Sequence, residues 1–205
     1  MAEDLRTRIA RRRREQVEQY AAQVAPLLGP GERVRGAARV TGDPLLPPPL
    51  PRRLRPQRPP TGDGRPFELG ARLMLLLDGP FKPLRALWRV PHGDPLRGGW
   101  ASRAGEVLRL LRSGPLRHRY AMYDEAVLVF TDHRVLLLDA GDGECFGEFP
   151  RAELVVGEPK RRPLRQATRV DLRFTDGSLL ALLGARGDDV EELRALLGGR
   201  PAQAG

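Results

Sequence analysis

An aspartate and a histidine stand side by side in the stretch VLVFTDHRVLLLD (127–139), between two apolar runs. Asp132 and His133 could act as an acid/base pair if a nucleophile or proton acceptor faced them. The sequence supplies no such group: His92 and His118 have no ligand spacing to His133, and G-x-S-x-G, H-E-x-x-H and paired-cysteine motifs are absent. Aspartate favours turns because its side chain bonds its own backbone. We therefore expect a hairpin bend, with His133 facing solvent.

Two further stretches could do chemistry. GDGECFG (141–147) has the glycines of a phosphate-binding loop, but it lies between two expected strands, whereas a phosphate cradle needs a helix N-terminus. Cys145, the only cysteine, is expected to be a small residue on a strand. The sequence thus predicts no catalytic residue, no metal site and no cofactor, and we expect a protein that is not an enzyme.

The positive charge is the one feature that points to a partner. The net charge is +9, and 33 of the 35 basic residues are arginine. Residues 1–118 hold 23 basic and 11 acidic residues, whereas 119–205 hold 12 and 15. Basic clusters attract the phosphates of nucleic acid or of anionic lipid head groups. The candidate anion- or partner-binding residues are Arg11, Arg12, Arg13, Arg14, Arg103, Arg109, Arg112, Lys160, Arg161, Arg162 and Arg165.

Three segments have apolar residues at helical spacing and residues that favour helix ends in or next to them. Helices are therefore predicted at 4–28, 102–113 and 188–199. In the last, Asp188 and Glu191 form a pair like a capping box. The proline-rich stretch 42–66 is predicted to be an exposed linker. Residues 67–100 fit either two strands or short helices.

A period of two predicts the strands. The first lies in 32–40 and has one basic, solvent-facing side. From residue 119, short strands at regular spacing are typical of an antiparallel meander. In TDGS (175–178), the Asp-Gly pair suits a type I′ hairpin turn. The strands are expected at 126–131, 134–139, 144–149, 153–158, 168–174 and 178–183.

The order of several short motifs resembles bacterial pleckstrin-homology-like (PH-like) and GRAM-like domains, of actinobacterial type given the arginine-rich composition. These motifs are L-x-P-G-E-R-V (28–34), the bend formed by Thr131, Asp132, His133 and Arg134, the stretch FTDGSLLALL and a C-terminal amphipathic helix. The resemblance implies an α+β fold: a bent antiparallel sheet or partly open barrel, capped at one end by the final helix. In phosphoinositide-binding relatives, basic residues sit on the loop after the first strand, which in this chain would be the whole of 41–118.

The resemblance and the element pattern together divide the chain. The expected parts are a basic amphipathic helix (1–28), a PH-like domain (29–40 and 119–199), an insertion (41–118) with a proline-rich linker (42–66) and a helix (102–113), and a disordered tail (200–205).

The expected function is that of a non-enzymatic binding or adaptor module. An unknown protein partner or an anionic membrane surface comes first, and nucleic acid bound through the arginine-rich N-terminal helix is the alternative. The single cysteine and the lack of an apolar N-terminal segment favour a cytoplasmic protein, free or peripheral to the membrane. The oligomeric state is left open.

Overall fold

A computed structural model describes residues 11, 15, 17–43, 46, 93–113, 125–157 and 167–198. The chain forms two compact units, Met1–Pro49 with Pro95–Gly205, and Leu50–Asp94. Within the second unit only residues 93 and 94 are described, so every helix and strand below belongs to the first. The expected divisions within 41–92, including the linker 42–66, lie largely outside the described residues, as does the tail 200–205.

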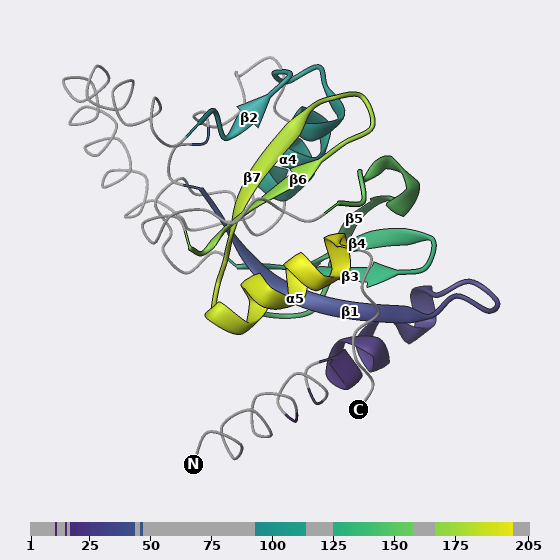
Figure 1. Cartoon of the computed structure of the whole chain (residues 1–205). Coiled ribbons are helices and arrows are strands. Elements are labelled where there is room, and N and C mark those ends of the chain that lie inside the picture. The colour runs from purple at the N-terminus through teal and green to yellow at the C-terminus, as the bar shows by residue number, and fades with distance from the viewer. Residues whose placement is uncertain are drawn as a thin grey trace, which may run out of the picture. The chain divides into compact units, whose positions relative to one another are not determined.

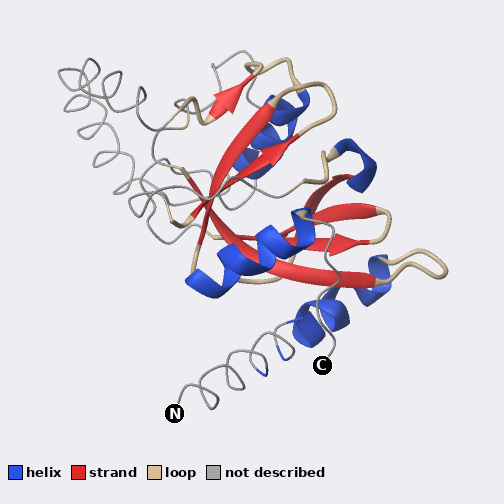
Figure 2. Cartoon of the chain, viewed as in Figure 1, coloured by secondary structure: helices blue, strands red, loops and turns tan. Residues whose placement is uncertain are grey.

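A curled antiparallel sheet and helices packed on it make an α+β fold, as expected (Figures 1 and 2). The expected hairpins and C-terminal helix are confirmed. The strands are β1 (Val34–Gly42), β2 (Leu96–Arg97), β3 (Ala126–Thr131), β4 (Arg134–Asp139), β5 (Cys145–Pro150), β6 (Arg169–Arg173) and β7 (Leu179–Gly184). The helices are α4 (Arg103–Ser113) and α5 (Gly187–Leu197), with 3-10 turns η1 (Ala25–Leu27) and η4 (Arg151–Glu153).

Strand β1 joins the two halves of the sheet. It pairs with β3 along most of its length and with β7 through its last three residues. β3, β4 and β5 follow as a meander, while β7 pairs with β6 on its other side. A bridge between Leu154 and Phe174 then links the chain after β5 to the chain after β6. The sheet therefore curls until its two ends meet at this bridge.

The inner face of the curl holds the main core, and helix α5 packs against it along β1 (Figure 1). Val190, Leu193, Leu196 and Leu197 of α5 are all buried. Gly36 permits this approach, because a Cβ atom there would lie 2.9 Å from a methyl carbon of Leu196. The stripe expected in 188–199 is thus the face that packs on the sheet.

Helix α4 also belongs to this core. Ala104, Val107, Leu108 and Leu111 are fully buried among the inner residues of the sheet. Ser102 caps the helix through Gly105 N–H, and the β6–β7 hairpin accepts two further N–H groups of its first turn. We expected the whole of 41–118 to be an insertion, but 95–113 lies in the same compact unit as the sheet.

The outer face of β1, β3 and β4 is covered by the helical segment 17–24. Tyr20 and Val24 of this segment are buried in a second apolar cluster. The Tyr20 hydroxyl also accepts a hydrogen bond from Arg39 Nε at 2.9 Å. The sheet residues of this cluster are Ala37, Val127, Val129, Leu136 and Leu138. Strands β3 and β4 are therefore buried on both faces, which explains why they read as continuous apolar runs.

Three local predictions were wrong. A strand was expected over 153–158, but in its described part, 153–157, the chain completes the turn η4 and forms a single bridge at Leu154. The β6–β7 hairpin has a three-residue loop, with Gly177 N–H bonded to the Phe174 carbonyl and Gly177 at φ +80°, rather than a two-residue turn. At the start of α5, the carboxylate that folds back is Asp189 rather than that of Glu191, and it accepts the N–H groups of Arg186 and Arg39.

The packing of α5 predicts a clear contrast between two substitutions on the same helix. Leu193→Ala should lower the free energy of unfolding by about 2–5 kcal/mol, because it removes a fully buried side chain and leaves a cavity. Glu191→Ala, which removes only an exposed ion pair with Arg194, should change it by less than about 0.5 kcal/mol. Urea denaturation measures both; equal stability of the two variants would contradict this packing of α5.

Candidate functional site at the β3–β4 bend

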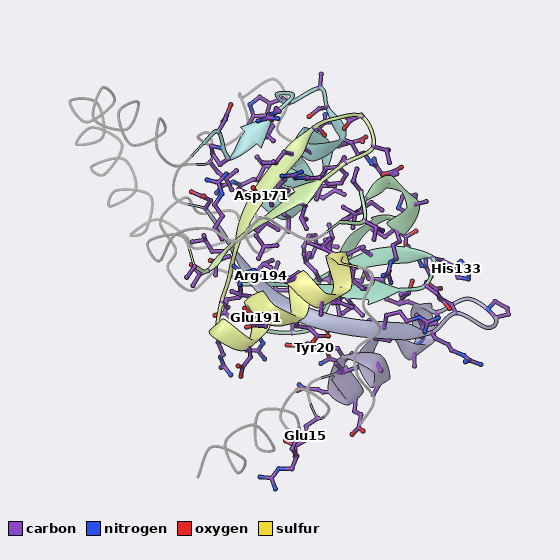
Figure 3. The ribbon with its side chains drawn as sticks, viewed as in Figure 1. Glu15, Tyr20, His133, Asp171, Glu191 and Arg194 are labelled. Atoms are coloured by element: carbon purple, nitrogen blue, oxygen red, sulfur yellow. The ribbon has the colours of Figure 1, made fainter. Side chains whose placement is uncertain are left out.

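Asp132 and His133 form a two-residue bend between β3 and β4, as expected. The His133 side chain is 71% exposed and points away from the sheet (Figure 3). Its nearest acidic atom is Asp132 Oδ1, 3.8 Å from Nε2. Because the ring faces solvent rather than a cleft, the pair has the geometry of a turn.

The hydroxyl of Thr131 fixes the shape of this bend. Thr131 Oγ1 accepts hydrogen bonds from the backbone N–H groups of His133 at 3.2 Å and Arg134 at 2.9 Å. It also lies 2.7 Å from Glu32 Oε1 and 2.9 Å from the Arg134 carbonyl oxygen, either of which can accept its single proton. Thr131 is fully buried, so its hydroxyl acts inside the protein.

Glu32, from the turn before β1, is the centre of the polar network. Arg134 donates to both of its carboxylate oxygens, from Nε at 3.0 Å and from Nη2 at 2.9 Å. Gly29 N–H donates to Oε2 at 2.9 Å, and only 5% of the side chain is exposed. The hydrogen bond from Arg134 is the largest influence on the pKa of Glu32 and, with Gly29 and Thr131, outweighs burial to lower it to about 2.

Arg134 carries this network to two further parts of the chain. Its Nη1 donates to Glu148 of β5 at 2.6 Å, and its Nη2 donates to the carbonyl of Leu27 at 2.6 Å. One guanidinium thus holds together β4, β5, the turn before β1 and the end of the N-terminal helical segment. The bond to Glu32 is the main cause that raises the pKa of Arg134.

Asp132 continues the pairing of β1 with β3 beyond the strands. Its Oδ1 accepts the N–H of Arg33 at 3.0 Å, and its own N–H donates to the Arg33 carbonyl at 3.2 Å. The bond from Arg33 is the chief cause that lowers the pKa of Asp132. The Asp132 carboxylate also lies 3.9 Å from Arg35 Nη2. Asp132 therefore has a structural role, and basic side chains surround it.

Arg151, in the turn η4, is placed at the same end of the sheet. Its Nη1 donates to the carbonyl of Thr131 at 2.9 Å, and its Nη2 to the carbonyl of Leu196 near the end of α5 at 3.3 Å. Burial, followed by the nearby charge of Arg35, lowers the pKa of Arg151. The structure thus brings Arg33, Arg35 and Arg151 to the bend, a grouping that the sequence did not reveal.

The basic residues predicted from sequence are not gathered at one place in the described residues. Arg103 is held by Glu106 and Glu153 and so helps to anchor α4. Arg109 and Arg112 are half-buried on the same helix. Arg11 is exposed and lies 3.8 Å from Glu15. The remaining candidates are outside the described residues: Arg12, Arg13, Arg14, Lys160, Arg161, Arg162 and Arg165.

The described residues contain no group of three or more His, Cys, Asp or Glu side chains placed to hold a metal ion. Within the same residues, no helix has the length and apolar character needed to cross a membrane.

Glu32→Gln should lower the free energy of unfolding at neutral pH by roughly 2–3 kcal/mol, because it removes a buried charge from Arg134. The pKa of Glu32 is lower in the folded protein, so its contribution is fully present above about pH 4.5 and is lost as pH falls through about 2. The gap between wild type and variant should therefore narrow over this range in urea denaturation. Glu148→Gln, at an exposed partner of Arg134, is the matched control, and a gap that stays constant with pH would refute this role of Glu32.

Thr131→Val should cost about 1–3 kcal/mol of stability, because it leaves two partly buried N–H groups of the bend, those of His133 and Arg134, without their acceptor. His133→Ala, two residues further along the same bend, should change stability by less than about 0.5 kcal/mol, because the His133 ring is exposed. Thermal unfolding compares the two. A larger loss for His133→Ala than for Thr131→Val would show that the histidine has a role inside the fold.

Comparison with protein-family models and with curated proteins gives no match.

Proposed function

We propose that this chain is a non-enzymatic, cytoplasmic binding module with a PH-like core, which engages a protein or an anionic membrane surface. One observation carries the proposal. At the bend, the Thr131 hydroxyl and the carboxylates of Glu32 and Asp132 are hydrogen-bonded within the structure. The side chains of Arg35, His133 and Glu148 are exposed there, without a partner arranged for proton transfer among the described residues. Such a surface is suited to association rather than to turnover.

Several features support a PH-like core. The two motifs behind the resemblance, Pro-Gly-Glu before β1 and Thr-Asp-x-Arg at the bend, meet through Glu32, Thr131 and Arg134. The sheet is antiparallel and curled, and the last helix packs on its inner face. Because a fold alone does not define an activity, the function is proposed from the surface at the bend.

The proposal of a non-enzymatic role is supported by how the candidate acid/base groups are placed. Asp132 accepts a backbone N–H from Arg33, and His133 is turned to solvent. Thr131 Oγ1 has its partners within the fold. Within the described ranges, none of these groups faces another across a cleft, which is the arrangement that general acid/base catalysis needs.

Binding of the purified full-length chain to three probes tests the proposal: nuclease-treated cytoplasmic extract, phosphatidylcholine vesicles with and without phosphatidylglycerol, and duplex DNA or single-stranded RNA. We expect either saturable, nuclease-resistant retention of a protein or vesicle flotation that requires the anionic lipid. Binding to nucleic acid alone, with affinity falling steeply as salt rises, would overturn the proposal in favour of the nucleic-acid alternative. Failure to bind any probe would also overturn it.

A further inference from the structure

An irregularity in β1 directs Arg35 outward. Val34 pairs with Thr131, and Gly36 pairs with Phe130. Thr131 and Phe130 are consecutive residues of β3, whereas Val34 and Gly36 are two residues apart, so Arg35 has no residue opposite it. Such a bulge adds one residue to a strand, and bulges commonly re-aim a side chain next to a functional site. The Arg35 side chain is 55% exposed.

Arg151 and Arg35 both lie next to the bend, since Arg151 Nη1 donates to the Thr131 carbonyl and Arg35 Nη2 lies 3.9 Å from the Asp132 carboxylate. The Arg151 guanidinium is held in place by two neutral carbonyl groups, those of Thr131 and Leu196. Arg35 is close enough for its charge to oppose that of Arg151. Asp132 offers one carboxylate near both arginines, and a second anion at this place would further offset their mutual repulsion.

Two exposed valines lie at the same end of α5. The Gly157 N–H donates to the carbonyl of Leu197, and the carbonyl of the preceding residue, Leu196, accepts a hydrogen bond from Arg151. Val155 and Val156, which precede Gly157, are 45% and 62% exposed. Most other large apolar side chains of the described residues are buried. Single exposed apolar residues are common, but an adjacent pair at the end of α5 to which Arg151 is bonded gives this end both apolar and cationic character.

The charges around this surface are mixed, and this bears on the partner. Four arginines share the bend region with three carboxylates: Arg33, Arg35, Arg134 and Arg151 with Glu32, Asp132 and Glu148. The attraction of a bilayer grows with each basic residue near its surface, and the carboxylates offset much of it. A protein segment, by contrast, can bring one carboxylate to the arginines without bringing further negative charge to Asp132 and Glu148.

We propose that Arg35, Arg151, Val155 and Val156, which together form the α5-end surface, bind an acidic segment of a protein partner. A carboxylate of that segment lies against Arg35 and Arg151, and a neighbouring apolar side chain packs on Val155 and Val156. The sequence that follows, 158–166, has four basic residues and one acidic residue, which also favours an acidic partner. This inference rests on the proposed binding function and names the partner's chemistry.

A selection of random peptides of about a dozen residues, displayed on phage, with the full-length chain as bait at 0.15 M salt, tests the inference. The selected peptides should carry Asp or Glu next to Leu, Ile, Val or Phe. By fluorescence anisotropy they should bind Arg35→Glu and Val156→Asp at least about tenfold more weakly than wild type. Arg97→Glu makes the same charge change at an exposed position on β2 and should bind within about twofold.

Three outcomes would overturn the inference. The first is selection of peptides without acidic residues, and the second is equal binding by Arg35→Glu and Arg97→Glu. The third is loss of phosphatidylglycerol-dependent vesicle flotation in Arg35→Glu, which would assign the surface to a bilayer. In each case the proposed binding function would survive if the chain still bound its probes. The substituted side chains are exposed, so each variant should remain folded. Thermal unfolding of each variant checks this, and a melting temperature close to that of wild type would show that weaker binding does not reflect misfolding.

Discussion

The carboxylate of Glu32 is buried and accepts hydrogen bonds from Gly29, three residues before it, and from Arg134, about a hundred residues after it. The Thr131 hydroxyl, equally distant in the chain, lies within hydrogen-bond distance of the same carboxylate. A buried charge is unfavourable unless it is paired and hydrogen-bonded, so this network tolerates few alternatives. It fixes the entry into β1 against the β3–β4 bend. Through Arg134 it also fixes β5 and the end of the helical segment that covers the outer face of the sheet.

The surface that we propose for binding depends on the same constraint. Asp132 is bonded to Arg33, the residue before β1, and Thr131 pairs with Val34, so the register of β1 on β3 is held at this point and the extra residue falls on Arg35. Arg151 is anchored to the Thr131 carbonyl and to α5, which brings the turn η4 and the valines after it to the same end. A structural network inside the fold thus positions the half-buried Arg151 and the exposed Arg35 at the same end of the sheet.

Much of this fold follows from sequence, because short-range rules govern it. Apolar runs bounded by turn residues locate β3, β4 and the Asp132-His133 bend, and an apolar stripe identifies α5. Long-range contacts are harder to predict. The continuous apolar runs of β3 and β4 require a cover on both faces, yet their pattern does not say that Tyr20 and Val24 provide it. Glu32 and Arg134 stood in two separate motifs, and their opposite charges were the one available signal that they pair. The bulge at Arg35 left no local signal.

A double-mutant cycle between Glu32 and Arg134 tests most directly whether this pair organises the fold. Free energies of unfolding would be measured for wild type, Glu32→Gln, Arg134→Met and the double variant. If the two side chains act as one buried unit, the loss in the double variant should fall short of the sum of the single losses by at least about 1.5 kcal/mol. Losses that add to within about 0.5 kcal/mol would mean that the two groups act independently, which would contradict a central role for their interaction.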